Sequence, residues 1–244
     1  SELELVFYDR QLRFLQSFSW DIDAAKPQRS FTAFDLWWFS LNFEMREAPT
    51  YKLNTSNQWV ETGVEAFVPY QLSGGVDYSY EPEPMWKNRV RLSAFVDSSL
   101  RADLRRFTDS SLVFGAGFRG RIAEFLEFNF RVSSENTAVY RYVPYWSQQL
   151  DVDPLNPLED LVKSFNFFNT NDRLASNFNM NSLSLTLVHH MPDWDLSLDY
   201  YGAYEVNEAE KRYEWQSRFT IALQWNPIPI VRREASYEEG QFNL

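Results

Sequence analysis

The chain has 244 residues, a formal net charge of −11 and no cysteine. The excess of acidic residues argues against nucleic acid as a partner, because phosphate backbones bind clustered Lys and Arg, and the lack of cysteine excludes disulfides and a thiol nucleophile. No run approaches the roughly 18 apolar residues of a membrane-spanning helix, so any membrane crossing would use strands.

Aromatic residues make up 18% of the chain, yet its mean hydropathy is only −0.45. Alternating apolar and polar residues produce that mixture and predict strands. The N-terminus lacks the basic region and apolar core of a signal peptide and enters a predicted strand directly, so we expect a segment of a longer chain.

In chain order, we expect strands at 3–8 and 12–20 and a turn at 21–30. A long strand is predicted at 31–46, although Asp35 interrupts its apolar side. Either the middle of this strand is covered on both faces, or its register shifts there.

Residues 48–58 are polar and predict a loop. A strand at 59–72 is expected to enter a hairpin turn at Ser73-Gly74-Gly75 and return through 76–80. The Glu-Pro-Glu-Pro sequence at 81–84 must be a connection, because proline cannot pair within a sheet.

The middle of the chain continues the pattern with a strand at 90–97 and a strand pair at 111–119 and 122–133. Residues 100–109 fit a helix or a strand equally well. Residues 140–172 predict a long loop that carries one or two helical turns, since 158–165 have helical apolar spacing. Such loops are usually functional or flexible, and this one carries the aromatic group Tyr140, Tyr142, Tyr145 and Trp146.

Strands at 181–189 and 194–204 precede the clearest strand of the chain, at 213–225. Tilted by roughly 40°, a strand of that length would cross the ~25 Å apolar band of an outer-membrane barrel, with aromatic residues near both interfaces. Its apolar positions include Tyr213, Trp215, Phe219, Ile221, Leu223 and Trp225.

These patterns predict an all-β fold: an antiparallel membrane β-barrel or partial barrel of about 8–10 long strands, with one short helix in a long loop. Residues 1–225 would form the barrel, as a segment of a larger one, and 226–244 a polar C-terminal tail. The alternative for 213–225 is a long edge strand of a soluble sheet.

The sequence contains no catalytic or nucleotide-binding motif, so we expect no enzyme and no cofactor. His189 and His190 are adjacent and would point to opposite faces of a strand, which excludes a shared metal. The acidic loop could hold calcium or could simply be solvated; its oxygen-bearing residues are Asp151, Asp153, Asn156, Glu159 and Asp160.

Basic residues on or beside predicted strands would line the lumen of a barrel and meet polar or anionic cargo. In a soluble sheet they would be ordinary surface charges. These residues are Arg91, Arg119, Arg121, Arg131 and Arg218.

The C-terminal half also carries a family pattern. It consists of Asp160-Leu161-Val162-Lys163-Ser164-Phe165-Asn166-Phe167, then Arg173, Ser176-Asn177-Phe178, 183–189 ending at His189, Asp193-Trp194 and the long last strand. Over about 140–233 this pattern resembles the end of the outer-membrane lipopolysaccharide-assembly barrel, the LptD family.

The resemblance implies a location in the bacterial outer membrane and transport or insertion of lipopolysaccharide or a related glycolipid. In that family a very large barrel works with a plug lipoprotein and periplasmic bridge proteins and opens between its first and last strands, so 213–225 would form one side of a lateral gate. This chain is too short for the whole barrel, shows no jelly-roll segment, and has Asp193 where members often carry cysteine.

Two other functions fit the residues. One is a soluble antiparallel barrel or sandwich that uses 140–146 to hold a ligand, and solubility without detergent would distinguish it. The other is a generic porin or adhesin, which would differ only in cargo.

Overall fold

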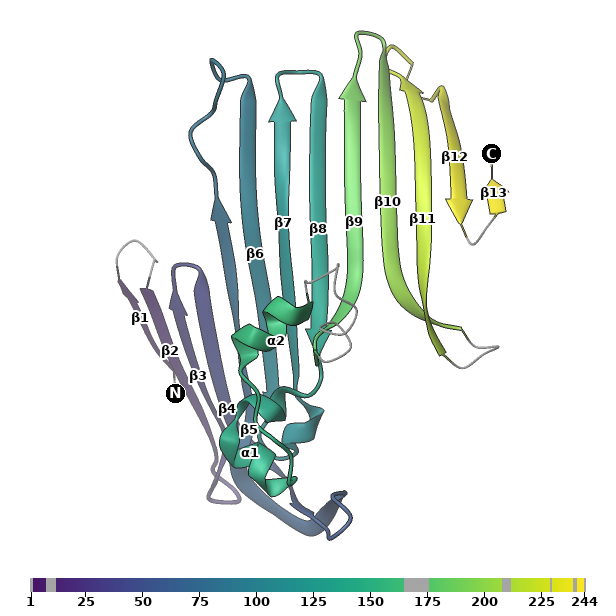
Figure 1. Cartoon of the computed structure of the whole chain (residues 1–244). Helices are drawn as coiled ribbons and strands as arrows, with labels where there is room; N and C mark the ends of the chain where they lie inside the picture. Colours follow the sequence, from purple (N-terminus) through teal and green to yellow (C-terminus); the bar gives the residue numbers. More distant parts are fainter. Residues whose placement is uncertain are drawn as a thin grey trace. The chain divides into compact units, whose positions relative to one another are not determined.

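The computed structural model describes residues 2–7, 12–164, 176–207, 212–228, 230–238 and 241–243. In this part of the chain thirteen strands follow one another in sequence order along one sheet (Figure 1). The strands are β1 (Glu2–Phe7), β2 (Leu12–Asp21), β3 (Lys26–Leu36), β4 (Phe39–Leu53), β5 (Trp59–Tyr80), β6 (Val90–Asp103), β7 (Ser111–Ile122), β8 (Leu126–Asn136), β9 (Asn179–His190), β10 (Trp194–Asn207), β11 (Arg212–Trp225), β12 (Arg232–Glu238) and β13 (Gln241–Asn243).

The expected all-β antiparallel architecture is confirmed. β1 to β5 pair antiparallel in succession, as do β9 to β13. The chain forms two compact units: unit 1 contains Ser1–Asp77, Asp97–Val113 and Glu135–Asn179, and unit 2 contains Tyr78–Val96, Phe114–Ser134 and Met180–Leu244.

The predicted loop between β8 and β9 carries the short helices of the chain (Figure 1). They are the 3₁₀ turn η2 (Val139–Tyr142), α1 (Pro144–Gln149) and α2 (Pro157–Ser164), and a further 3₁₀ turn, η1 (Phe107–Asp109), precedes β7. Asn156 Oδ1 accepts the backbone N–H of Leu158 at 3.0 Å, which caps α2. No helix in the described part of the chain is long and apolar enough to cross a membrane.

The predicted single strand at 31–46 is wrong, because the chain turns back at Trp37-Trp38 between β3 and β4. Trp37 adopts a left-handed φ of 48°, which non-glycine residues rarely do. The interrupted alternation around Asp35 therefore marks two strand ends that pair across a tight turn, with Leu36 opposite Phe39.

The hairpin predicted at Ser73-Gly74-Gly75 is also wrong, since β5 runs through it for 22 residues. A Cβ on Gly74 would lie 2.6 Å from the Ser40 carbonyl oxygen, and one on Gly75 equally close to the Ser98 carbonyl oxygen. These glycines allow neighbouring backbones to approach closely rather than to turn.

Other predicted boundaries shift. β4 extends through Leu53 into the predicted loop, and the β7–β8 turn lies at 123–125 instead of 119–121. The predicted polar tail after Trp225 contains β12 and β13, so β11 is not the last strand and the expected count of 8–10 strands is too low. The connection at 81–84 is confirmed.

The described residues bury few large apolar side chains. Among them ten hydrophobic side chains are buried, and half are alanines within strands. Of the five larger ones, Phe107, Val139 and Phe178 lie in unit 1 beside the helical segments, and Phe95 and Val132 lie on strands of unit 2. Phe107 stacks on Trp146 with ring centroids 5.4 Å apart. The strands thus leave most of their large apolar side chains outside a dry core.

We predict that Gly117→Ala destabilises the fold more than Gly120→Ala, although both lie on β7. A Cβ at Gly117 would meet the Phe130 carbonyl oxygen at 2.2 Å, which is backbone and cannot move alone, whereas a Cβ at Gly120 meets only the Phe128 ring. We expect a loss of about 1–3 kcal/mol for Gly117→Ala and less for Gly120→Ala, measured by urea unfolding followed by tryptophan fluorescence. Equal losses would contradict this interpretation of the two contacts.

Candidate functional site

One face of β9, β10 and β11 carries the apolar side chains predicted for the long strands. Strand register aligns three rows across it: Leu185–Tyr200–Phe219, Leu187–Leu198–Ile221 and His189–Leu196–Leu223. Leu185, Phe219 and Ile221 remain 40%, 38% and 39% exposed. Apart from His189 these side chains are aliphatic or aromatic, and they form a surface, which we call the apolar face, that is not packed into a dry core.

Aromatic residues bound the apolar face at both ends of β11. At one end Trp194 and Trp225 stack with centroids 6.1 Å apart. At the other, Trp215 donates from Nε1 to the Tyr200 hydroxyl at 3.3 Å, and its ring occupies the space that a side chain at Gly202 would fill. Ten residues separate Trp215 from Trp225, which spans about 33 Å along a strand and about 25 Å at a 40° tilt.

The opposite face of the same strands is polar. Asp199 pairs in register with Thr220, and Thr220 with Ser236 of β12. Arg218 on this face forms an ion pair with Glu238. The alternation expected for 213–225 is therefore present in β11; of Tyr213 only the backbone belongs to the described residues.

Unit 2 also contains a cavity of about 710 Å³ beside β6, β7, β8 and β9, lined by both charged and apolar residues; we call it the polar groove after its charged residues. Basic and acidic side chains both line it, and the Arg121 Nε lies 3.4 Å from the Glu127 Oε1. The charged lining residues are Glu81, Glu83, Arg91, Arg119, Arg121 and Glu127. Arg91, predicted on one strand, and Arg119 and Arg121, predicted at a turn farther along the chain, thus line the same cavity.

Phe95 links two of the predicted basic residues. Its ring is buried and lies against Gly117, and the guanidinium carbons of Arg119 and Arg131 lie 4.5 Å and 5.7 Å from its centroid. Cation–π attraction at this range holds the two positive charges close together. Sequence reasoning missed Phe95, because it lies on the polar side of the predicted alternation, between Ser93 and Asp97.

Among the family-pattern positions in unit 1, Asp160 has a structural environment that the sequence did not predict. The residue is 4% exposed, and its carboxylate accepts hydrogen bonds from the Tyr142 hydroxyl at 2.6 Å and the Asn177 backbone N–H at 3.1 Å. Asn136 in turn donates to the Tyr142 hydroxyl. Burial, and then the hydrogen bond to Asp160, raise the pKa of Tyr142 above its ordinary value.

The other family-pattern positions are dispersed. Ser164 Oγ donates to the Leu161 carbonyl at 2.7 Å, and the Asp193 carbonyl accepts the Asn226 N–H at 2.8 Å. Phe165 and Arg173 lie outside the described residues. Within the part of the chain that the structure describes, the pattern therefore assembles only in part: Asp160 contacts Ser176 and Asn177 in unit 1, whereas His189, Asp193 and Trp194 belong to unit 2.

Several of the residues considered for metal binding have other partners. Glu159 pairs with Lys163 at 2.7 Å, which lowers the pKa of Glu159 through that hydrogen bond. His189 contacts the Phe125 ring edge, while His190 Nδ1 lies 2.9 Å from Asp195 Oδ1. Across the described ranges no three His, Asp or Glu side chains form a group that could hold a metal ion.

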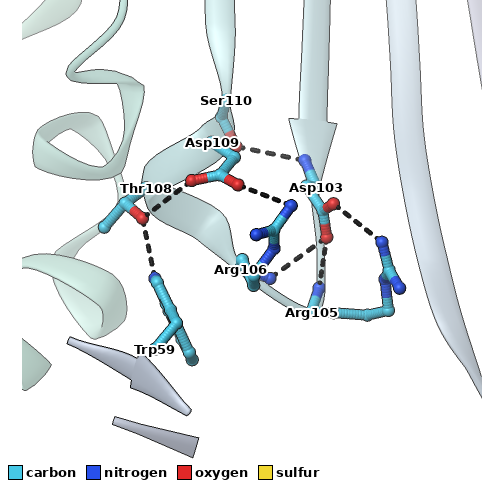
Figure 2. Close-up of polar contacts among 7 residues, drawn as sticks. All are labelled: Trp59, Asp103, Arg105, Arg106, Thr108, Asp109 and Ser110. Atoms are coloured by element: carbon cyan, nitrogen blue, oxygen red, sulfur yellow. Dashed lines mark hydrogen bonds and ion pairs between the residues drawn. The ribbon is translucent and has the colours of Figure 1, made fainter. Parts of the chain in front are cut away.

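A second polar cluster closes the connection from β6 to β7 in unit 1 (Figure 2). Asp103 Oδ1 accepts the backbone N–H groups of Arg105 and Arg106 at 2.9 and 3.1 Å, and Arg106 pairs with Asp109 at 2.8 Å. Trp59 Nε1 donates to Thr108 Oγ1 at 2.7 Å. An aspartate that binds the following N–H groups is a turn-forming arrangement, so this cluster is structural.

Comparisons with known proteins do not identify a family. No family model matches the chain, and no curated protein matches it. A solved structure, described as "Crystal structure of Acinetobacter baumannii OccAB4", is 10% identical, with a TM-score of 0.34 over 99% of this chain and 70% of that one. Such a likeness is too weak to carry a functional argument, and the resemblance to the LptD family stays a prediction.

We predict that Tyr142→Phe lowers the free energy of unfolding at neutral pH, and that the free energy of unfolding of the variant falls less than that of the wild type at alkaline pH. Removing the hydroxyl leaves the buried Asp160 carboxylate one donor short, which costs about 1–3 kcal/mol. Because folding raises the pKa of Tyr142, its protonated hydroxyl contributes to the free energy of unfolding. This contribution is fully present below the ordinary tyrosine pKa of about 10 and is lost progressively as the pH rises above it.

Urea unfolding of both proteins from neutral pH to about pH 11 checks this. The wild-type free energy of unfolding should fall more steeply above about pH 10 than that of the variant. Parallel pH dependences would show that Tyr142 has no shifted pKa.

Proposed function

We propose that this chain is an outer-membrane β-barrel protein, or a segment of one, whose apolar face contacts lipid. The single observation that carries the proposal is the apolar face itself: Leu185, Phe219 and Ile221 are partly exposed within it, and tryptophans bound it at both ends. Its estimated span of about 25 Å matches the apolar band of outer-membrane strands.

The energetics favour lipid over water as the partner of this face. Burying apolar surface contributes about 25 cal/mol per Å², so a face of leucine, isoleucine and phenylalanine gains several kcal/mol by leaving water. A soluble sandwich would obtain that gain by packing these side chains inward, and their exposure argues against that alternative. Paired tryptophan and tyrosine side chains suit the two membrane–water interfaces.

The polar groove supports a water-filled space on the other side of the strands. Arg91, Arg119 and Glu127 on adjacent strands line the cavity, and charged pairs of both signs are stable only where water or counter-charges solvate them. A polar solute would meet donors and acceptors there. A porin or an adhesin would share this design and differ in cargo.

We predict that Ile221→Arg is costly and Thr220→Arg is not. The two residues are adjacent on β11 but lie on opposite faces, so the variants add the same charge at the same depth. A charge on the lipid side near the midplane costs about 2–4 kcal/mol, while a lumen substitution is tolerated. Urea unfolding in phospholipid vesicles measures both, and similar costs would refute the assignment of faces.

A finer function is the delivery of lipopolysaccharide or a related glycolipid, which the resemblance of 140–233 implies, with a plug lipoprotein and periplasmic bridge proteins as partners. An amphiphile needs a polar route for its sugars and an apolar exit for its acyl chains. β11 is 14 residues long and fully paired with β10, whereas β12 has seven residues. The weaker seam beside β11 is therefore the one toward β12.

We predict that a disulfide between Thr220→Cys and Ser236→Cys blocks glycolipid delivery, since these positions pair across β11 and β12. The control joins Thr220→Cys to Asp199→Cys across β10 and β11 and should leave delivery intact. The readout is cell-surface lipopolysaccharide in bacteria that depend on the variant, with and without reductant. Undiminished delivery under the first tether would reject a gate at this seam.

A further inference from the structure

A second cavity of unit 2, of about 820 Å³, lies where three connections meet. These are the segment before β6, the β7–β8 turn at 123–125 and the β9–β10 connection at 191–193. Backbone hydrogen bonds hold them together: His190 N–H donates to the Phe125 carbonyl at 2.7 Å, and Ala123 N–H donates to the Arg89 carbonyl. We call this cavity the end pocket.

The end pocket is positively charged although the chain as a whole carries −11. Arg89, Arg91 and Arg121 line it, against one carboxylate, Glu124. Arg121 is engaged with Glu127 at 3.4 Å. Within the described part of the chain, the guanidinium groups of Arg89 and Arg91 have no carboxylate partner, so their donors are available to a ligand.

The backbone beside these arginines is strained. Trp86, Lys87 and Asn88 are three consecutive non-glycine residues with φ of 55°, 59° and 65°, a left-handed conformation that side chains normally disfavour. The bridge between Met85 and Val90 closes this turn. Strain of this kind persists where surrounding structure maintains it and is concentrated at functional sites; here it fixes the start of the segment that carries Arg89.

The end pocket lies at the Trp194–Trp225 end of the apolar face. Met191, one of its lining residues, donates its N–H to the Trp194 carbonyl at 2.8 Å. Phe125, one of its lining residues, is 44% exposed, and Trp86, in the strained turn that leads to the lining residue Asn88, is 77% exposed. Basic groups beside exposed aromatic rings are the combination found where proteins meet charged lipid headgroups.

We propose that the end pocket binds the phosphate group of an anionic ligand, through Arg89 and Arg91. Guanidinium groups bind phosphate oxygens in a two-donor geometry that a lysine ammonium cannot reproduce. The ligand source favoured by the aromatic rim is a phospholipid headgroup, with free phosphate as the other source. The lipid source rests on the proposed membrane location, whereas phosphate binding does not.

The test uses the full chain in uncharged maltoside micelles, titrated calorimetrically with dihexanoyl phosphatidic acid and, separately, with inorganic phosphate. We expect phosphatidic acid to bind and the R89Q/R91Q variant to bind it about tenfold or more weakly. The matched control is R232Q/R233Q, which removes the same two charges from β12 in the same unit and should bind within about twofold of wild type.

Further variants keep the outcome decisive. R89K/R91K retains charge and should show intermediate affinity, while W86A should weaken phosphatidic acid and leave inorganic phosphate unaffected. Inorganic phosphate that binds as tightly as the lipid, and equally depends on the arginines, would support the phosphate site and reject the lipid source. Absence of binding to both probes, or equal losses in the two double variants, would overturn the proposal; the Ile221→Arg comparison tests the membrane location independently.

Discussion

Antiparallel hydrogen bonding between sequence neighbours is the constraint on which the rest of the structure depends. Each strand from β2 to β12 has a neighbour on both sides, so backbone groups are satisfied within the sheet and the two faces can differ in chemistry. The register of β10 and β11 determines which side chains form the apolar face, because a shift of one residue would turn Phe219 and Ile221 to the polar side.

The strands with regular alternation were predictable, and most of the turns were not. β9, β10 and β11 alternate over most of their length, so period two alone located them close to their observed bounds. The turns at Trp37 and Ala123 use left-handed φ without glycine or asparagine, which leaves no turn signal in the sequence. Gly74 and Gly75 are residues typical of turns, but here they lie within β5 and allow neighbouring strands to approach closely.

The candidate site was predictable as a set of residues and not as an arrangement. Alternation placed Arg91, Arg119 and Arg121 on or beside strands, but which of them share a cavity depends on the pairing of β6, β7 and β8. The contact of Phe95 with the two arginines could not be predicted from the sequence, because its ring occupies the space left by Gly117 on the next strand. Asp160 belongs to an acidic segment, which predicts that its carboxylate is solvated. In the structure it is buried instead, where Tyr142 and Asn177 donate hydrogen bonds to it.

Alternation also has a consequence for the chain before it folds. Polar residues separate the apolar ones along β9 to β11. Before the strands pair, this part of the polypeptide therefore has no continuous apolar segment of the kind that is inserted into bilayers as a helix. Strand pairing gathers the dispersed side chains onto one surface. In the membrane location that we propose, insertion would therefore become favourable only after the strands have paired.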